Sequence, residues 1–373
     1  MRALLINAVC GIRSTGNICI DIAHNLENKG YKVKIAYGRE ECPDEYQDYG
    51  VRIGNTVSVY YHAFMTKLFD DRGFQSKHAT EKFLSWANEY NPDLLWLHNL
   101  HDYYINVEML FEWIKARPDM EVKWTQHDCW AFTGGCMHFE MSHCDQWKTG
   151  CQKCNRNEIN FHPFIYRTHR NYIKKKNTFT NVVNMQIITP SKWMEDVVSK
   201  SFLGCYPIKT EYNKIDISDF KPTPSDFREQ FNLGSKFVIL GVASAWSKAK
   251  GLNDMLELAS KLDDRFVIVL VGLTERQKAA LPQNIIGIVR TNNKKELAEI
   301  YTASDVFLNL TYQDTYPTVN LEAQACGTPV ITYNTGGSPE SVPDRNVVEQ
   351  GDLRSIIEKL KTGNYEKKRE DTI

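Results

Sequence analysis

The sequence lacks a long hydrophobic run, an excess of charge of one sign, and a short-period repeat. Within its 373 residues there is no stretch of about 18 consecutive apolar residues, so we expect no helix to span a bilayer. The 45 Lys and Arg residues nearly balance 46 Asp and Glu residues, which gives a formal net charge of −1. This balance provides no long-range field for a polyanion and argues against nucleic-acid binding.

The N-terminus also lacks the features of a secretory signal. The apolar run at residues 3–6 is much shorter than a signal-peptide core, and no small-residue cleavage site follows it. We therefore expect a cytoplasmic protein, with peripheral contact at the inner face of the membrane left open. In that compartment the ten cysteines are expected to be reduced thiols or metal ligands rather than disulfides.

The pattern of apolar runs indicates an α/β protein with two domains, as the length also suggests. Residues 3–6, a glycine-containing loop at 11–16, a helical pattern at 18–28 and an alternating segment at 32–37 form a βαβ unit. Continuous apolar runs that alternate with helical patterns are typical of parallel strands covered on both faces. Further strands are expected at residues 93–98, 122–127, 185–191, 236–241, 266–272, 306–310 and 329–333.

The most specific segment spans residues 312–340. Asp314 lies in a loop before a predicted helix, and Glu322 lies eight positions later within that helix. Two carboxylates so placed can accept bidentate hydrogen bonds from the vicinal hydroxyls of two different sugars. The intervening loop amides near Thr315, Tyr316 and Thr318 precede the helix, where they can meet a diphosphate. Alternatively, Asp314 caps the helix and Glu322 belongs to a solvated face.

A strand-to-helix turn at residues 241–252 carries two lysines. Lys248 and Lys250 both precede Gly251 at the expected start of a helix. The helix dipole slightly disfavours cations at this end. A bound anion therefore explains the two lysines better than solvation alone.

These motifs resemble those of the retaining glycosyltransferases of family four, which have the GT-B fold. In that family an acidic residue, seven others and then Glu occur at the start of a helix in the second domain, and here Asp314 replaces the more usual first Glu. The resemblance implies that Asp314 contacts the donor sugar, that Glu322 holds the ribose and that Lys250 neutralises the leaving diphosphate. Many members also carry an Arg near positions 244–246, which this sequence lacks, so Lys248 is the candidate for the second charge.

Three histidines in the first half follow predicted strands, where strand ends face a ligand crevice. The resemblance implies that His127 meets the donor sugar and makes His98 and His101 candidates on the acceptor side. The alternative for each is a buried imidazole satisfied by the backbone. The glycine loop that ends at Gly16 is a weaker candidate, because its amides could approach a phosphate or an acceptor.

Four cysteines have the spacing C-x7-C-x6-C-x2-C. Four thiolates suit a structural, tetrahedral zinc, and the closing pair is typical of a zinc knuckle. Similar insertions occur in a subgroup of these transferases linked to colanic acid and other bacterial polysaccharides. The alternative is a set of buried or oxidised thiols. The candidate ligands are Cys136, Cys144, Cys151 and Cys154.

A basic stretch at residues 167–176 lies in the first half of the chain. Such a run is usually a solvated helix face. It could also meet anionic lipid headgroups or a lipid diphosphate, because each Lys or Arg near a membrane contributes about 1 kcal/mol.

The sequence thus predicts the GT-B fold: two doubly wound Rossmann-like domains with an interdomain cleft. We expect residues 1–203 on the acceptor side, with a cysteine-rich insertion at about 129–160, residues 204–345 on the donor side, and residues 346–373 as a helical tail packing back on the first domain. The tail is strongly charged, and its end is expected to fray.

The expected activity is transfer of a sugar from a UDP- or GDP-type nucleotide sugar to a glycan or lipid-linked glycan, with retention of anomeric configuration, in bacterial surface polysaccharide biosynthesis. We expect no cofactor to be required for catalysis and no nucleic-acid partner. The alternatives are a GT-B sugar-nucleotide epimerase and a catalytically inert sugar-nucleotide-binding partner of a polysaccharide assembly.

Overall fold

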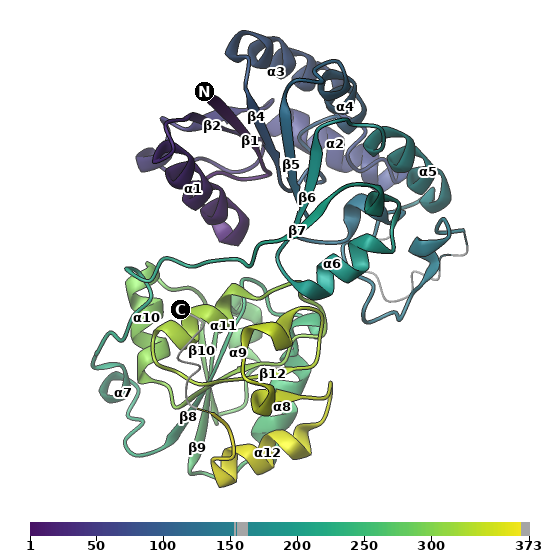
Figure 1. Ribbon diagram of the computed structural model, residues 1–373. Coiled ribbons are helices and arrows are strands. Elements are labelled where there is room, and N and C mark those ends of the chain that lie inside the picture. The colour runs from purple at the N-terminus through teal and green to yellow at the C-terminus, as the bar shows by residue number, and fades with distance from the viewer. Residues whose placement is uncertain (153, 155–162, 367–373) are drawn as a thin grey trace. The chain divides into compact units, whose positions relative to one another are not determined.

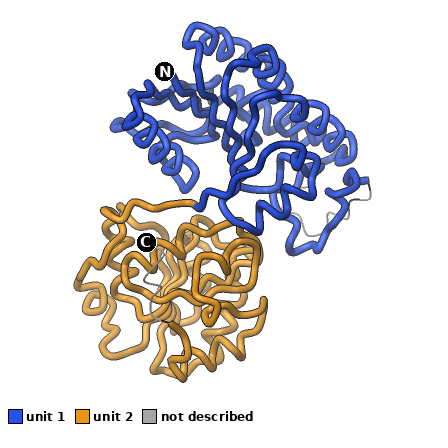
Figure 2. Tube along the Cα trace, viewed as in Figure 1, with its two compact units in different colours: residues 1–212 blue, residues 213–373 orange. Residues whose placement is uncertain are grey.

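The computed structural model describes residues 1–152, 154 and 163–366. The chain divides into two compact units, Met1–Tyr212 and Asn213–Ile373 (Figure 2). Each unit contains one parallel β-sheet with helices packed against it (Figure 1). Among the described residues, no helix combines the length and apolar character that a transmembrane span requires.

The sheet of unit 1 has seven strands in the order β3-β2-β1-β4-β5-β6-β7. The order 3-2-1-4-5-6 is that of the doubly wound Rossmann fold. The strands are β1 Arg2–Ile6, β2 Lys32–Tyr37, β3 Gly50–Arg52, β4 Leu94–Leu97, β5 Glu121–Thr125, β6 Met185–Thr189 and β7 Ile208–Thr210. The helices are α1 Arg13–Glu27, α2 Thr56–Phe69, α3 Lys77–Tyr90, α4 Val107–Lys115, α5 Thr168–Phe179 and α6 Lys192–Ser199.

Residues 3–6 of strand β1 are continuously apolar because both faces of the strand are covered. Leu4 and Ile6 belong to the hydrophobic cluster on one face of the sheet, whereas Ala3 and Leu5 belong to the cluster on the other face. Successive side chains of a strand point to opposite faces, so a strand covered on both sides has no polar position. The predicted pattern is confirmed here.

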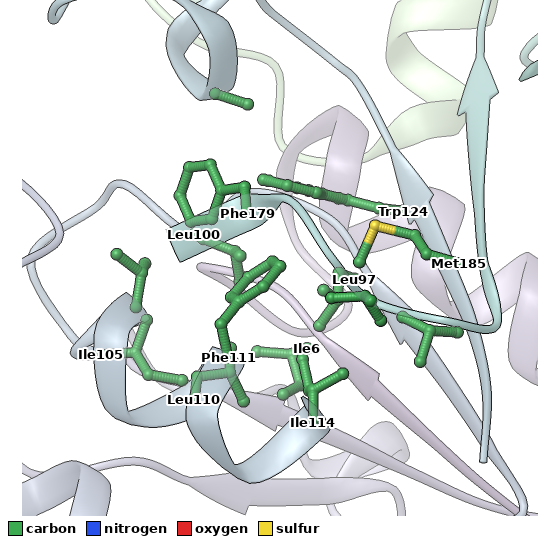
Figure 3. Packing of buried hydrophobic residues seen from close by; sticks show 14 of the residues in the cluster. Ile6, Leu97, Leu100, Ile105, Leu110, Phe111, Ile114, Trp124, Phe179 and Met185 are labelled. Atoms are coloured by element: carbon green, nitrogen blue, oxygen red, sulfur yellow. The ribbon is translucent and has the colours of Figure 1, made fainter. Parts of the chain in front are cut away.

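The larger of these two clusters is centred on aromatic rings (Figure 3). The ring of Phe179 on α5 lies 4.7 Å from that of Phe111 on α4 and 4.9 Å from that of Trp124 on β5, measured between centroids. These contacts fix α4 and α5 on the same face of the sheet.

The sheet of unit 2 has six strands in the order β10-β9-β8-β11-β12-β13. Val267 and Val269 of β9 are buried on one face, and Ile268 and Leu270 on the other. The strands are β8 Phe237–Val242, β9 Phe266–Val271, β10 Ile285–Ile288, β11 Val306–Asn309, β12 Val330–Tyr333 and β13 Val347–Val348. The helices are α7 Phe227–Gln230, α8 Leu252–Lys261, α9 Glu275–Ala279, α10 Lys294–Ala303, α11 Thr318–Ala325 and α12 Leu353–Thr362.

The C-terminal helix α12 belongs to unit 2. Its residues Leu353, Ile356 and Leu360 are buried in a cluster that also contains Met255 and Leu258 of α8. Helix α12 therefore completes one face of the second sheet.

The first helix differs from its predicted limits. It begins at Arg13 rather than near residue 18, so Gly16 lies inside α1 and not in the preceding loop. A Cβ atom at Gly16 would come within 3.2 Å of the Gly11 nitrogen and of the Val9 side chain. The glycine therefore lets α1 pack directly on the loop that follows β1.

Candidate active-site residues in the two units

In unit 2, a lysine and a carboxylate from two different loops are joined by an ion pair. Lys250 ends a 3-10 turn, Lys248–Lys250, that follows β8, and Asp314 lies in the loop that follows β11. Lys250 Nζ lies 2.8 Å from Asp314 Oδ2 and 3.3 Å from the carbonyl oxygen of Gln313. Strands β8 and β11 are neighbours in the sheet, so the structure brings these two predicted site residues together at its carboxyl edge.

Two glycines make this arrangement possible. Gly251 has a φ of +74°, and a Cβ atom there would come within 2.2 Å of the carbonyl oxygen of Leu310. Gly336 has a φ of +53°, and a Cβ atom there would come within 1.8 Å of the carbonyl oxygen of Asp314. Both positions require a left-handed backbone and leave no room for a side chain.

Asp314 also organises its own loop. Its Oδ1 accepts a hydrogen bond from the Tyr316 amide at 3.3 Å. The N-cap residue of α11 is Pro317, so the predicted alternative of Asp314 as the helix cap is wrong. Thr315 and Tyr316 are buried, and Thr318 is the first residue of α11.

Glu322 on α11 is recessed rather than part of a solvated face. The Tyr301 hydroxyl donates a hydrogen bond to its Oε2 at 3.1 Å. Burial raises the pKa of Glu322 above its ordinary value, and hydrogen bonds from Tyr301 and Thr318 partly offset this effect. Sequence reasoning missed Tyr301, which reads only as an apolar position of α10.

A buried amide fixes the position of α11. Asn320 donates to Ser341 Oγ at 2.8 Å and accepts from Asn309 Nδ2 at 2.8 Å. These bonds connect α11 to β11 and to the segment after Gly337. Because a buried amide is costly unless it is paired, the network specifies one orientation of the helix that carries Glu322. In the sequence, a polar Asn320 within an apolar helical pattern was the feature that could have indicated this buried network.

In unit 1, His98 and His127 form a pair at the ends of β4 and β5. His98 Nδ1 lies 2.9 Å from His127 Nε2, and the two rings are stacked with centroids 5.2 Å apart. Within the described residues, the buried Nε2 of His98 has no hydrogen-bond partner. Burial lowers the pKa of His98 well below its ordinary value and that of His127 to about 4, so both imidazoles are neutral at pH 7.

His101 has the opposite charge state. Its Nδ1 lies 3.0 Å from Asp102 Oδ1, and its Nε2 lies 2.7 Å from Asp128 Oδ2. Burial disfavours the imidazolium, but attraction to the Asp128 and Asp102 carboxylates outweighs burial and raises the pKa of His101 to about 9. Asp128 also accepts from the Trp130 amide at 2.8 Å. Asp102 and Asp128 were not among the predicted site residues. Each directly follows a histidine in the sequence, and that His-Asp pairing could have indicated them.

The four candidate zinc ligands line one small pocket, together with the ring of Trp147. Cys151 Sγ accepts a hydrogen bond from the Gly134 amide at 3.2 Å. In the part of the chain that the structure describes, no group of three or more His, Cys, Asp or Glu side chains is disposed to hold a metal ion. The pocket is lined by Cys136, Cys144, Cys151 and Cys154.

One lysine of the basic stretch at 167–176 points into the protein. Lys175 is 1% exposed, and its Nζ donates to the carbonyl oxygens of Trp130 at 2.6 Å and Thr133 at 3.0 Å. The same ammonium lies 3.9 Å from the Trp130 ring centroid. The interpretation of this stretch as a solvated helix face is therefore wrong at Lys175, whereas Arg170 and Lys176 are exposed.

Residues 225–371 match the family model described as glycosyl transferases group 1. The putative colanic acid biosynthesis glycosyl transferase WcaC of Escherichia coli K12 is 23% identical over 359 residues, which cover 91% of this chain and 85% of that protein.

Solved structures show the same architecture. Sucrose-phosphate synthase from Thermosynechococcus elongatus superimposes with a TM-score of 0.69 at 14% identity, covering 96% of this chain and 88% of that one. Anabaena HepE in complex with UDP-glucose gives a TM-score of 0.63 at 15% identity, covering 97% and 89%. The predicted GT-B fold is confirmed, and the similarity to the glycosyl transferases group 1 model lies within unit 2.

Proposed function

We propose that this chain is a retaining glycosyltransferase that moves a sugar from a UDP- or GDP-type donor to a glycan or lipid-linked glycan, at the cytoplasmic face of the membrane in bacterial surface polysaccharide biosynthesis. The observation that carries the proposal is the Lys250–Asp314 pair with Glu322 recessed in the adjacent helix. The similarity to a transferase named for colanic acid biosynthesis, and to a structure that binds UDP-glucose, supports it.

Glu322 is assigned the role of binding the nucleotide of the donor. Its carboxylate is held by Tyr301 and can accept hydrogen bonds from the two ribose hydroxyls. The amides of Thr315, Tyr316 and Thr318 precede or begin α11, where the helix N-terminus favours negative charge and can meet the diphosphate.

Lys250 is assigned the role of stabilising the leaving diphosphate. The pair with Asp314 is neutral as a whole, so an arriving diphosphate would attract the ammonium while the Asp314 carboxylate accepts a hydrogen bond from the donor sugar. Lys248 is exposed on the same turn and is the candidate for the second cation. In front-face attack the leaving phosphate takes the acceptor proton, so this chain contributes positioning and electrostatic stabilisation.

In unit 1, neutral His127 is proposed to contact the donor sugar, with His98 and His101 on the acceptor side. The charged His101 holds Asp128, the neighbour of His127, in a single orientation. We assign His101 a positioning role for this reason. The loop between β1 and α1, which ends before Arg13, is proposed to offer backbone amides to a phosphate or acceptor.

A structural zinc is proposed for the cysteine pocket. Four thiols line one cavity, and the buried Lys175 interacts electrostatically with Cys151 and Cys136, which would offset part of the charge of their thiolates. Zinc would hold the connection between β5 and α5 in place and would take no part in sugar transfer.

Replacing Glu322 by Ala should weaken nucleotide binding by about 2 to 3 kcal/mol, because a charge-assisted contact to the ribose is lost. Calorimetry with UDP and GDP measures this. The exposed Glu358 on α12 provides a matched control, and Glu358→Ala should bind like the unaltered protein. Unchanged affinity in Glu322→Ala would remove the ribose assignment.

Replacing Lys250 by Ala should lower kcat about 100- to 1000-fold while changing donor affinity much less, because charge on the leaving group grows in the transition state. Turnover is followed as nucleotide release and as labelled acceptor product from UDP- and GDP-sugars. Lys261→Ala, on the surface of α8, serves as control. Release of an isomerised sugar would identify an epimerase instead, and binding without any turnover would identify an inert partner.

Purified protein should contain about one zinc per chain, and Cys151→Ser should lower both the zinc content and the melting temperature. The exposed Cys205 is the control, because Cys205→Ser should change neither. Elemental analysis and thermal unfolding measure the two quantities. Metal-free native protein of unaltered stability would rule the zinc out.

The stabilisation contributed by His101 should depend on pH with a defined sign. Because its folded pKa is raised to about 9, the stabilisation is fully present below the unfolded value of about 6.5 and is lost as pH rises through 9. The unaltered protein should therefore be more stable than His101→Gln by a margin that shrinks by up to about 3 kcal/mol as the pH rises from 6 to 10. Denaturant titrations measure this difference. The exposed His78 is the control, and a pH-independent difference for His101→Gln would show that the imidazole is neutral.

A further inference from the structure

Helix α2 presents its apolar stripe outward. Val57, Tyr60, Tyr61 and Phe64 are spaced i, i+3, i+4 and i+7, and their exposed fractions are 76%, 72%, 55% and 59%. In a surface helix such a stripe normally faces the core. Here the residues that α2 buries most deeply are polar, namely His62 and Thr66.

This inverted orientation is fixed by specific hydrogen bonds. His62 Nδ1 lies 2.8 Å from Ser76 Oγ, and His62 Nε2 accepts from the Gly73 amide at 3.1 Å. A capping box between Asn55 and Ser58 holds the start of the helix. Turning the stripe toward the core would break these bonds and leave buried polar groups unpaired, which is costly. The outward stripe is therefore specified by the structure.

A second segment extends the apolar surface. Phe164, Ile165 and Tyr166 are exposed by 76%, 46% and 49%. The amides of Phe164 and Ile165 donate to the carbonyl oxygens of Lys67 and Leu68, at 2.9 and 3.1 Å. The segment thus lies directly beside the end of α2. We call the seven exposed side chains of these two segments the aromatic surface: Val57, Tyr60, Tyr61, Phe64, Phe164, Ile165 and Tyr166.

The exposed apolar side chains of this protein are concentrated in one place, whereas on ordinary protein surfaces such residues are scattered singly. In the described residues, 14 large hydrophobic side chains are exposed, and seven of them form the aromatic surface. Contiguous apolar surface of this kind marks a site that binds a protein or a membrane.

The charged side chains beside the aromatic surface are mostly cationic. Residues 56–69 and 163–176 contain no Asp or Glu, and their Lys and Arg residues other than the buried Lys175 number five. Lys67 Nζ lies 5.9 Å from the ring centroid of Phe164, and Arg170 is exposed beside the same segment. The nearby Asp71 carboxylate is 3.6 Å from Arg167 and 3.7 Å from Arg170, so it offsets only part of this charge.

We propose that the aromatic surface of unit 1 binds a bilayer that contains anionic phospholipid. Tyr and Phe rings would enter the headgroup region, where amphipathic rings are favoured, and Lys67 with Arg170 would meet lipid phosphates. A second copy of the chain fits less well, because a symmetric contact would place these cations against one another. The proposal rests on α2 and not on the donor site.

Vesicle flotation tests the proposal with the whole chain. The protein should float with phosphatidylcholine vesicles that contain about 30% phosphatidylglycerol and much less with phosphatidylcholine alone, because the cations add affinity for anionic lipid. The double variant Tyr60→Ser with Phe64→Ser should bind the anionic vesicles at least about tenfold more weakly, since apolar area is lost. Lys67→Glu should reduce binding to the anionic vesicles and its sensitivity to salt.

Matched controls are two equally exposed apolar residues outside the aromatic surface. Val183→Ser and Ile217→Ser, which are 80% and 58% exposed in the unaltered protein, should float normally. If the double variant of α2 does not fold, Phe164→Ser on the neighbouring segment replaces it. Thermal shift by UDP or GDP should persist in every folded variant, so loss of vesicle binding is separable from failure of the proposed donor site.

Two results would overturn the proposal. One is absence of flotation with the anionic vesicles, or equal flotation of the double variant. The other is a dimer, seen by light scattering, that the double variant converts to a monomer without any vesicle binding, because the aromatic surface would then be a subunit interface.

Discussion

The candidate site of unit 2 depends on one steric constraint: three backbone segments meet without intervening side chains. The turn that carries Lys250 approaches the loop after β11 at Gly251, and the segment after β12 approaches the same loop at Gly336. These contacts bring Lys250 Nζ to 2.8 Å from Asp314 Oδ2. Any side chain at either glycine would push the loop that bears Asp314 away from the sheet.

Unit 1 uses a different physical device, the separation of charge states within a buried cluster. His98 and His127 are neutral because burial dominates, whereas His101 is charged because two carboxylates outweigh burial. The three histidine side chains therefore differ in protonation: charged His101 can only donate hydrogen bonds, whereas each neutral imidazole has one donor and one acceptor nitrogen. Of these nitrogens, the Nε2 of His127 is already engaged with His98 Nδ1.

Much of the architecture could be predicted from the sequence, because strands covered on both faces read as unbroken apolar runs. The motif around Asp314 and Glu322 could be located in the sequence because its two carboxylates are eight positions apart, and the roles inferred from it are proposals. The orientation of helix α2 could not be predicted, because an apolar stripe of helical period is expected to face the core and here it faces outward. The burial of Lys175 was also missed: its partners are the carbonyl oxygens of Trp130 and Thr133, 45 and 42 residues away, which no local pattern encodes.

The connection between β5 and β6 has a consequence for how the chain folds. Val122 pairs with Met185 in the parallel register, so the cysteine pocket and α5 lie inside one long crossover between β5 and β6 of the first sheet. The entropy of closing such a loop grows only logarithmically, by about 0.6 kcal/mol for each doubling of length, so the insertion costs little equilibrium stability. Its main effect is kinetic, because the search for a distant strand partner slows folding. Strands β6 and β7 can therefore join the first five strands only after the whole crossover has been synthesised, so the insertion delays completion of unit 1 during translation.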